Sequence, residues 1–170
     1  MSKKILVTGG AGYIGTTLVP LLLKKGHQVT VYDNLTVDGS GLIHNFGEPN
    51  FRFIKGDILD VSELKKATEG QDIVIHLAAI VGYAACRRDE ELTHAVNHQG
   101  TKNVISCLDG KQFLVYGSTG SNYGAVEDVC TEETPLNPLS IYGISKTLGE
   151  QEVMKYENSS AFRFATAFGV

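Results

Sequence analysis

The chain has 170 residues, of which 42% are hydrophobic and 20% charged, a balance typical of a folded domain with a sizeable core. Its formal net charge of −4, without a basic run, argues against binding to nucleic acid. No apolar run reaches the roughly 18 residues of a membrane span. The first strand pattern starts without a signal peptide, so we expect a cytoplasmic protein in which Cys86, Cys107 and Cys130 stay reduced.

The first expected strand, residues 4–8, ends in a glycine-rich turn, and a helical pattern follows at once over 13–25. Gly9, Gly12 and Gly15 give the spacing G-x-x-G-x-x-G. Such glycines allow a sharp turn, a close approach of the backbone to a pyrophosphate, and tight packing of helix on strand. Phosphates then bind the N–H groups at the helix start. The turn therefore predicts a dinucleotide site, although alone it also fits an ordinary strand-to-helix turn.

The second expected strand, 28–33, ends in Asp33, which stands 18 residues after Gly15. A carboxylate at this place can accept hydrogen bonds from the adenosine ribose hydroxyls. It would also repel a 2′-phosphate, and no arginine follows nearby, so we expect NAD rather than NADP. The alternative for Asp33 is a plain turn or helix-capping acid.

Strand and helix patterns alternate along the rest of the chain. We expect strands at 51–55, 72–77, 112–117 and 160–165, and helices at 61–69, 88–108 and 139–157. This alternation predicts an α/β fold: a Rossmann-type, doubly wound parallel sheet with helices on both faces, formed by residues 1–170 as one NAD-binding domain. The run 73–77 is almost continuously apolar, as in a strand covered on both faces. His76, within it, is expected to be a core histidine.

Two later segments contain groups suited to chemistry. Tyr142 and Lys146 lie four residues apart at the start of a helix and therefore share a face. A phenol titrates near 10, and a nearby ammonium and a nicotinamide ring would favour the phenolate, which can exchange a proton with a hydroxyl. Thr119 and Ser118 end a buried strand, where Thr119 could donate a hydrogen bond to the reacting oxygen. The alternatives are a surface tyrosine–lysine pair and a turn that satisfies its own backbone.

The histidines show no convincing metal-binding pattern. His94 and His98 lie four residues apart on a predicted helix, which is the spacing of a zinc pair. No third ligand is evident, so we predict no metal site.

Together these segments resemble the extended short-chain dehydrogenase/reductase group, and within it the NAD-dependent nucleotide-sugar epimerase/dehydratase family. The resemblance covers nearly the whole chain. Its motifs are TGGAGYIG at 8–15, DNL at 33–35, GDI at 56–58, HLAA at 76–79, VN at 96–97, STGSNYG at 118–124, YGISK at 142–146 and RFATAFG at 163–169. Family members usually continue into a nucleotide-sugar lobe, so we expect the C-terminal substrate lobe to be largely missing.

The resemblance assigns a role to each matching residue. It implies a catalytic triad of Thr119, Tyr142 and Lys146. The implied substrate contacts are Val81, Ser118, Thr119 and Thr166. The implied NAD contacts are Gly9, Gly12, Tyr13, Ile14, Gly15, Asp33, Asn34, Asp57, Ile58, Leu77, Ala78, Ala79, Asn97, Tyr142 and Lys146.

The activity implied by the resemblance is that of an NAD-dependent epimerase or 4-dehydrogenase on a nucleotide-activated sugar. Tyr142 would take the proton of the C4 hydroxyl while NAD accepts a hydride, giving a transient 4-keto sugar. In the 4,6-dehydratases an Asp-Glu pair follows the catalytic threonine, and the related decarboxylases use a Glu at the second position. This chain has Gly120 and Ser121 there, which disfavours both reactions. Thr166 also departs from the family, in which many members have Asn.

Several points stay open at this stage. Arg87 and Arg88 could meet a substrate phosphate or be solvated surface residues. A homodimer is expected, because in the family the helices near 88–108 and 139–157 pack against their copies. The alternatives to a sugar epimerase are a reductase on another carbonyl substrate and an NAD-binding module without turnover. The triad argues against such a module, whereas the missing lobe favours it.

Overall fold

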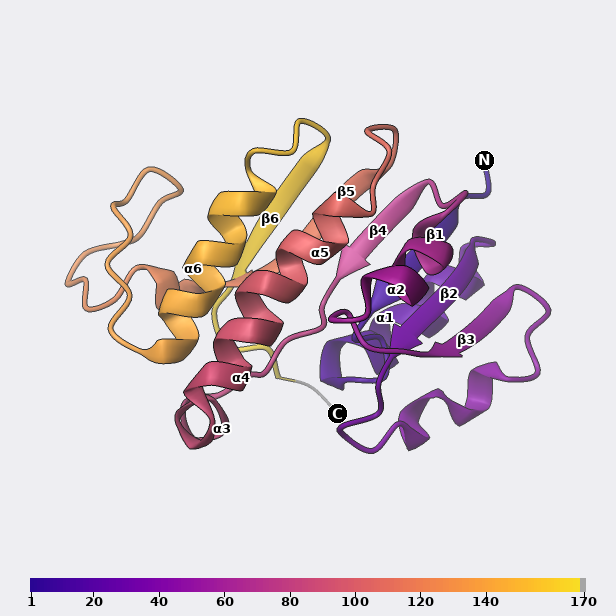
Figure 1. Cartoon of the computed structure of the whole chain (residues 1–170), viewed down its shortest axis with the longest axis horizontal. Helices are drawn as coiled ribbons and strands as arrows, with labels where there is room; N and C mark the ends of the chain where they lie inside the picture. The colour runs from indigo at the N-terminus through magenta and orange to yellow at the C-terminus, as the bar shows by residue number, and fades with distance from the viewer. Residues whose placement is uncertain (169–170) are drawn as a thin grey trace.

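A six-stranded parallel sheet with helices on both faces forms the body of the computed structural model, which describes residues 1–168 (Figure 1). The strand order is β3-β2-β1-β4-β5-β6. The strands are β1 (Lys4–Thr8), β2 (Gln28–Asp33), β3 (Phe51–Lys55), β4 (Ile73–His76), β5 (Phe113–Thr119) and β6 (Ser159–Phe164). The order reverses between β1 and β4, and in open α/β sheets ligands bind at this switch point, outside the carboxyl ends of the strands. The predicted doubly wound sheet is therefore confirmed.

The helices that connect the strands fall into two layers. They are α1 (Tyr13–Lys24), α2 (Val61–Thr68), α3 (Tyr83–Arg88), α4 (Glu90–His94), α5 (Gly100–Ser106) and α6 (Ile141–Val153), with 3₁₀ turns η1 (Ser40–Asn45) and η3 (Gly120–Asn122) and a π-helical segment η2 (Ala95–Gln99). In Figure 1, α2, α5 and α6 lie in front of the sheet and α1 behind it. The core is correspondingly split between the two faces.

Alternate residues of the central strands supply the two halves of the core. Leu6 and Val74 pack on the face covered by α2 and α5. Val7 and Val31 pack on the opposite face with Val19 of α1. All five side chains are fully buried, and each contributes about 1.5–3 kcal/mol of hydrophobic stabilisation. Burial on both faces explains why these strands are apolar at consecutive positions.

The helical pattern predicted near 88–108 is present from Glu90 to Ser106, and its start differs from the prediction. A separate helix, α3, ends at Arg88, and Asp89 then adopts an extended conformation with φ −146° and ψ 92°. The Asp89 carboxylate accepts a hydrogen bond from the Leu92 N–H at 2.8 Å and so caps the start of α4. The chain stays helical from Glu90 to Ser106, but η2 interrupts its regular hydrogen bonding with a π segment.

The last predicted helix, 139–157, is shorter in the structure. The Ser140 hydroxyl accepts a hydrogen bond from the Gly143 N–H at 3.0 Å and fixes the start of α6, which ends at Val153. Downstream, the motif at 163–169 begins in β6, and its last residue, Gly169, lies outside the described residues. Within residues 1–168, no helix combines the length and apolar character needed to cross a bilayer.

Candidate functional site

The glycine turn after β1 lies directly against the end of β4. Gly9 has φ +70°, and a Cβ atom built on it would lie 2.4 Å from the backbone nitrogen of Ala78. A Cβ on Gly15 would lie 2.3 Å from the carbonyl oxygen of Gly10. Both positions therefore require glycine, because only a bare backbone lets β1, β4 and α1 meet this closely. At Gly15 the close contact is between α1 and the turn that follows β1, since Gly10 lies in that turn.

The start of α1 is suited to an anion. Gly12 is the N-cap residue, so no side chain caps this end, and the first turn contains no acidic residue. The N-terminus of a helix of this length attracts negative charge through its N–H groups and its dipole. Of the two residues predicted to line this start, Tyr13 is 63% exposed and Ile14 is half-buried.

Acidic and amide side chains gather where β2 and β3 end. The Asp33 carboxylate accepts hydrogen bonds from the Ala11 N–H at 3.0 Å and the Leu35 N–H at 2.8 Å. Asn34 donates from Nδ2 to Asp57 Oδ2 at 3.0 Å. Three of the predicted adenosine contacts are thus together beside the glycine turn. The fourth, Ile58, is 4% exposed with its side chain in the core, which leaves only its backbone for a ligand.

Asn97 connects the end of β4 to α6. Its Oδ1 accepts a hydrogen bond from the Ile80 N–H at 2.7 Å, and its Nδ2 donates to the Ile80 carbonyl at 2.9 Å. The same Nδ2 donates to Ser145 Oγ at 3.0 Å, and Ser145 in turn donates to the Tyr142 carbonyl at 2.9 Å. Asn97 therefore fixes the backbone that follows the predicted cofactor contacts Leu77, Ala78 and Ala79 relative to α6.

Thr119 and Tyr142 meet at the carboxyl end of β5. The turn after Thr119 packs on the start of α6, because a Cβ atom built on Gly143 would lie 2.9 Å from the Ser121 carbonyl oxygen. Thr119 is 5% exposed, and its Oγ1 accepts a hydrogen bond from the Ser121 N–H at 3.1 Å. Burial raises the pKa of Tyr142, and this outweighs the lowering effect of the Thr119 side chain. In the structure as it stands, the phenol is therefore the favoured form at neutral pH.

Lys146 lies one turn after Tyr142 and is only 2% exposed. Its Nζ is 4.0 Å from the centre of the Tyr116 ring, a cation–π arrangement. Burial lowers the pKa of Lys146 to about 7, although the charge of Glu150 opposes this shift. The expected lowering of the Tyr142 pKa by a neighbouring ammonium is absent, because Lys146 is itself desolvated and lies over the Tyr116 ring.

Sequence reasoning missed Glu150, which lies one turn beyond Lys146 on α6. Its carboxylate is 4% exposed and accepts a hydrogen bond from Ser118 Oγ at 2.5 Å. The Ser118 hydroxyl, predicted as a substrate contact, therefore points into the protein. The four-residue spacing of Tyr142, Lys146 and Glu150 is the one signal that could have placed Glu150 on the same face.

His76 is a fully buried residue with a partner for each ring nitrogen. Thr8 Oγ1 lies 2.7 Å from Nδ1, and Thr101 Oγ1 lies 3.1 Å from Nε2. Because Thr101 donates its proton to the Asn97 carbonyl at 2.7 Å, Nε2 must be the protonated nitrogen of His76. Burial, with a smaller effect from Lys146, lowers the pKa of His76 to about 3. His76 is thus a neutral core histidine, as predicted.

The other candidates lie at the surface. Val81 is 61% exposed, and Thr166 and Arg88 are also exposed. Arg87 donates from Nη1 to the Tyr83 hydroxyl at 3.2 Å, a contact within α3. Nδ1 of His98 lies 3.3 Å from Nε2 of His94. Within the part of the chain that the structure describes, no three His, Cys, Asp or Glu residues form a group able to hold a metal ion.

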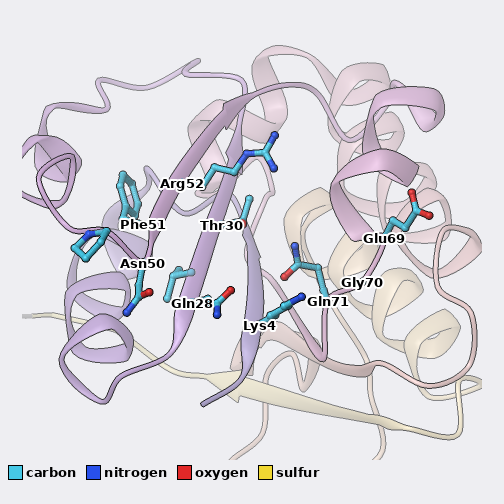
Figure 2. A pocket seen from close by; sticks show the side chains of 11 residues that line it. Lys4, Gln28, Thr30, Asn50, Phe51, Arg52, Glu69, Gly70 and Gln71 are labelled. Atoms are coloured by element: carbon cyan, nitrogen blue, oxygen red, sulfur yellow. The ribbon is translucent and has the colours of Figure 1, made fainter.

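Two hollows in the described surface lie away from Thr119 and Tyr142. One, of about 330 Å³, lies at the amino ends of β1, β2 and β3, on the opposite edge of the sheet from the glycine turn. Figure 2 shows its polar side chains, among them Lys4, Gln28 and Arg52, spread over the strands. The other, of about 360 Å³, is apolar and lies beside η1. Neither contains the predicted catalytic residues.

The sequence is similar to those of known enzymes. The sequence profile of the NAD dependent epimerase/dehydratase family matches residues 5–168. The UDP-glucose 4-epimerase of Corynebacterium glutamicum is 32% identical over 98% of this chain and 48% of its own length. The UDP-N-acetyl-alpha-D-glucosaminuronate decarboxylase of Bacillus cytotoxicus is 36% identical over 73% of this chain and 39% of its own length.

A solved structure is similar over almost the whole chain. The UDP-glucuronic acid 4-epimerase of Bacillus cereus, in complex with NAD, superposes with a TM-score of 0.86 at 31% identity. The match covers 98% of this chain and 58% of that protein. The chain spans between 36% and 57% of the length of the first curated relatives that it matches.

Proposed function

Because the chain belongs to the NAD-dependent epimerase/dehydratase family, we propose that it binds NAD at the glycine turn and acts on a nucleotide-activated sugar. The proposed reaction is that of an epimerase or 4-dehydrogenase, through a transient 4-keto sugar. The observation that carries the proposal is the close packing of the turn after Thr119 on the start of α6, the helix that holds Tyr142 and, one turn further along, Lys146. This group lies on the same edge of the sheet as the glycine turn and Asp33.

The residues at the carboxyl edge fit a dinucleotide. Side chains at positions 9 and 15 would fill the turn, and the start of α1 has neither a capping side chain nor an acid to compete with a pyrophosphate. We propose that Gly12, Tyr13 and Ile14 hold the phosphates and that Asp33 holds the adenosine ribose. The further proposed contacts are Asn34, Asp57, the backbone of Ile58, Leu77, Ala78, Ala79, Asn97, Tyr142 and Lys146. When bound, NAD supplies a hydride acceptor that can return the hydride.

The chain's own residues would move the proton. Thr119 orients the sugar hydroxyl, and Tyr142 accepts its proton and later returns it. Burial holds the Tyr142 pKa high in the structure described here, so a positive charge next to the phenol would be needed to favour its ionised form. A protonated Lys146 and the nicotinamide ring are the proposed sources of that charge. Val81 and Thr166 are proposed sugar contacts at the exposed rim; Ser118 has its hydroxyl bonded to Glu150 instead.

The turn after Thr119 favours epimerisation or dehydrogenation over elimination. Gly120 and Ser121 form the start of η3, and neither has a carboxylate that could act as acid or base. The Glu150 carboxylate is close by, but it is buried and bonded to Arg163. The described residues of this turn therefore fit the oxidation and reduction of an alcohol. They provide no second acid–base pair for an elimination.

A panel of nucleotide sugars tests the proposal. The chain is mixed with NAD and with UDP-glucose, UDP-N-acetylglucosamine, UDP-glucuronic acid or dTDP-glucose. The absorbance of reduced NAD reports a keto sugar, and NMR identifies a changed sugar. We expect turnover of at least one sugar, and its abolition in Tyr142→Phe with NAD affinity changed by less than about threefold. Activity that survives Tyr142→Phe would disprove the mechanism, and turnover of only non-sugar carbonyls would make the chain a reductase. NAD binding without any turnover would make it a binding module.

We also propose a homodimer formed by the helical face that carries α4 and α6. Leu92 of α4 is 45% exposed, Ile144 of α6 is 46% exposed, and Met154, the C-cap residue of α6, is 59% exposed. Sedimentation equilibrium should show a dimer that Met154→Glu weakens. A monomer at all concentrations would refute this part of the proposal.

A further inference from the structure

The buried carboxylate of Glu150 accepts hydrogen bonds from three side chains. Besides Ser118, its carboxylate accepts bonds from Asn122 Nδ2 at 2.9 Å and from Arg163 Nη2 at 2.5 Å and Nε at 2.9 Å. Ser118 precedes Thr119, and Asn122 ends the turn that follows it. One carboxylate on α6 therefore contacts the chain on both sides of Thr119.

Arg163 extends the same contacts to β6. It lies opposite Ser118 in the β5–β6 register. Its Nη1 donates to the Tyr123 hydroxyl at 2.9 Å, and its guanidinium lies 5.0 Å from the centre of the Tyr123 ring. The carboxylate of Glu150 thus connects β5, β6 and the turn at Asn122 to α6.

The position of Glu150 on α6 relates it to Tyr142 and Lys146. Tyr142, Lys146 and Glu150 follow one another at four-residue intervals, so their side chains leave one face of the helix. Replacing a buried ion pair by apolar residues is often neutral or stabilising, so stability alone gives little reason for a carboxylate here. A fixed geometry between Thr119 and Tyr142 gives a better reason, because proton transfer depends on it.

We propose that Glu150 is a positioning residue, which holds the Thr119 turn against α6 so that the Thr119 and Tyr142 hydroxyls meet. This inference deepens the proposed function and rests on it for its kinetic consequence. Its geometric content, the placement of the Tyr142 hydroxyl, can be measured without any substrate.

The test compares Glu150→Gln with Glu152→Gln. Gln keeps the size of the side chain but replaces an accepting oxygen with a donating NH₂ group, which cannot serve Ser118, Asn122 and Arg163 together. Glu152 lies on the same helix and pairs with Lys155 at 2.9 Å, at the surface. The two variants therefore make the same chemical change on α6, and only one of them touches the Thr119 turn.

Two readouts separate positioning from folding stability. Tyrosine labelled with ¹³C at Cζ gives one NMR signal per phenol, and Tyr142→Phe identifies the Tyr142 signal. We expect Glu150→Gln to move this signal and Glu152→Gln to leave it in place. With a nucleotide sugar that the chain turns over, we expect kcat to fall about 10- to 100-fold in Glu150→Gln, with the Kd of NAD changed less than about threefold.

Each outcome of this test either supports or overturns the proposed role of Glu150. A Tyr142 signal and kcat unchanged in Glu150→Gln would overturn the proposal, even if its Tm falls. If the unmodified chain turns over no sugar, the proposed function fails, whereas the Tyr142 signal still decides the role of Glu150. If Glu150→Gln does not fold, Ser118→Ala replaces it, because that variant keeps the pair of Glu150 with Arg163. A moved Tyr142 signal in Ser118→Ala supports the proposal, and an unmoved one overturns it.

Discussion

The carboxylate of Asp33 accepts a hydrogen bond from the backbone N–H of Ala11 at 3.0 Å, so the end of β2 and the glycine turn form one unit. Its other oxygen accepts the Leu35 N–H at 2.8 Å. Asp33 therefore shapes the turn before any cofactor arrives, in addition to its proposed contact with the ribose.

Asp33→Asn should weaken NAD binding and reduce the preference for NAD over NADP. An amide NH₂ cannot accept the Ala11 N–H, and the charge that repels a 2′-phosphate is lost. Losing a hydrogen bond to a charged group costs about 2 kcal/mol, or about 30-fold in affinity. Fluorescence titration with NADH and NADPH measures both effects. Asp38→Asn is the control, since Asp38 is an exposed acid bonded to Ser40 and should leave both affinities unchanged.

Gly15→Ala should destabilise the fold and abolish NAD binding. Its Cβ would lie 2.3 Å from the Gly10 oxygen, so α1 would have to move away from the turn. Overpacking of this kind costs about 1–3 kcal/mol. Urea unfolding measures the loss. Gly47→Ala is matched to it, because nothing lies within 4 Å of a Cβ at Gly47, and it should change stability by less than about 1 kcal/mol. Equal effects of the two substitutions would refute the packing argument.

His76 should make the fold sensitive to acid. The pKa of His76 lies at about 3 in the fold against 6.5 for an ordinary histidine. The unfolded chain therefore takes up a proton below pH 6.5 that the folded chain does not, and the free energy of unfolding decreases as the pH falls towards 3. For this one group the slope is at most about 1.4 kcal/mol per pH unit.

Urea unfolding at about pH 7 and about pH 5 checks this dependence on His76. His76→Gln should lose less stability between the two pH values than the unmodified chain does. The exposed His44 provides the control, and His44→Gln should behave as the unmodified chain. An identical pH dependence in His76→Gln would show that other groups cause the acid sensitivity.

Asn97→Ala should leave the Ile80 backbone without partners. Asn97 is 1% exposed and satisfies both the N–H and the carbonyl of Ile80. The expected loss is about 2 kcal/mol, or about 4–8 °C in Tm, measured by thermal unfolding. Gln99→Ala removes one bond, to Asn103 at 3.0 Å, from the same π segment and should cost clearly less. A smaller effect at Asn97 than at Gln99 would contradict this account.

The sequence was sufficient to predict the sheet and the close approach of Asp33 to the glycine turn. Apolar runs such as 73–77 are local signals, and so is the distance from Gly15 to Asp33, because each depends on residues close in the chain. The π segment could not be predicted, since it depends on how η2 packs on α6 around Asn97. The spacing of residues along the chain does not predict such tertiary effects. The break at Asp89 follows from a local capping residue, whose signal competes with the helical pattern on either side of it.

Contacts between distant segments explain the other differences. Glu150 gains its role from Ser118 and Arg163, which are 32 and 13 residues away in the chain. The lowered pKa of Lys146 depends on its burial over the Tyr116 ring, 30 residues earlier. No spacing rule in one sequence indicates these contacts, because they exist only once β5, β6 and α6 are packed together.

The most direct test of the central claim is calorimetric titration of the 170-residue chain with NAD and, separately, with NADP. The account predicts saturable binding of NAD at one site per chain, with NADP binding at least about tenfold weaker because of the Asp33 carboxylate. Failure to bind NAD, or binding of NADP that is as tight as that of NAD, would contradict it.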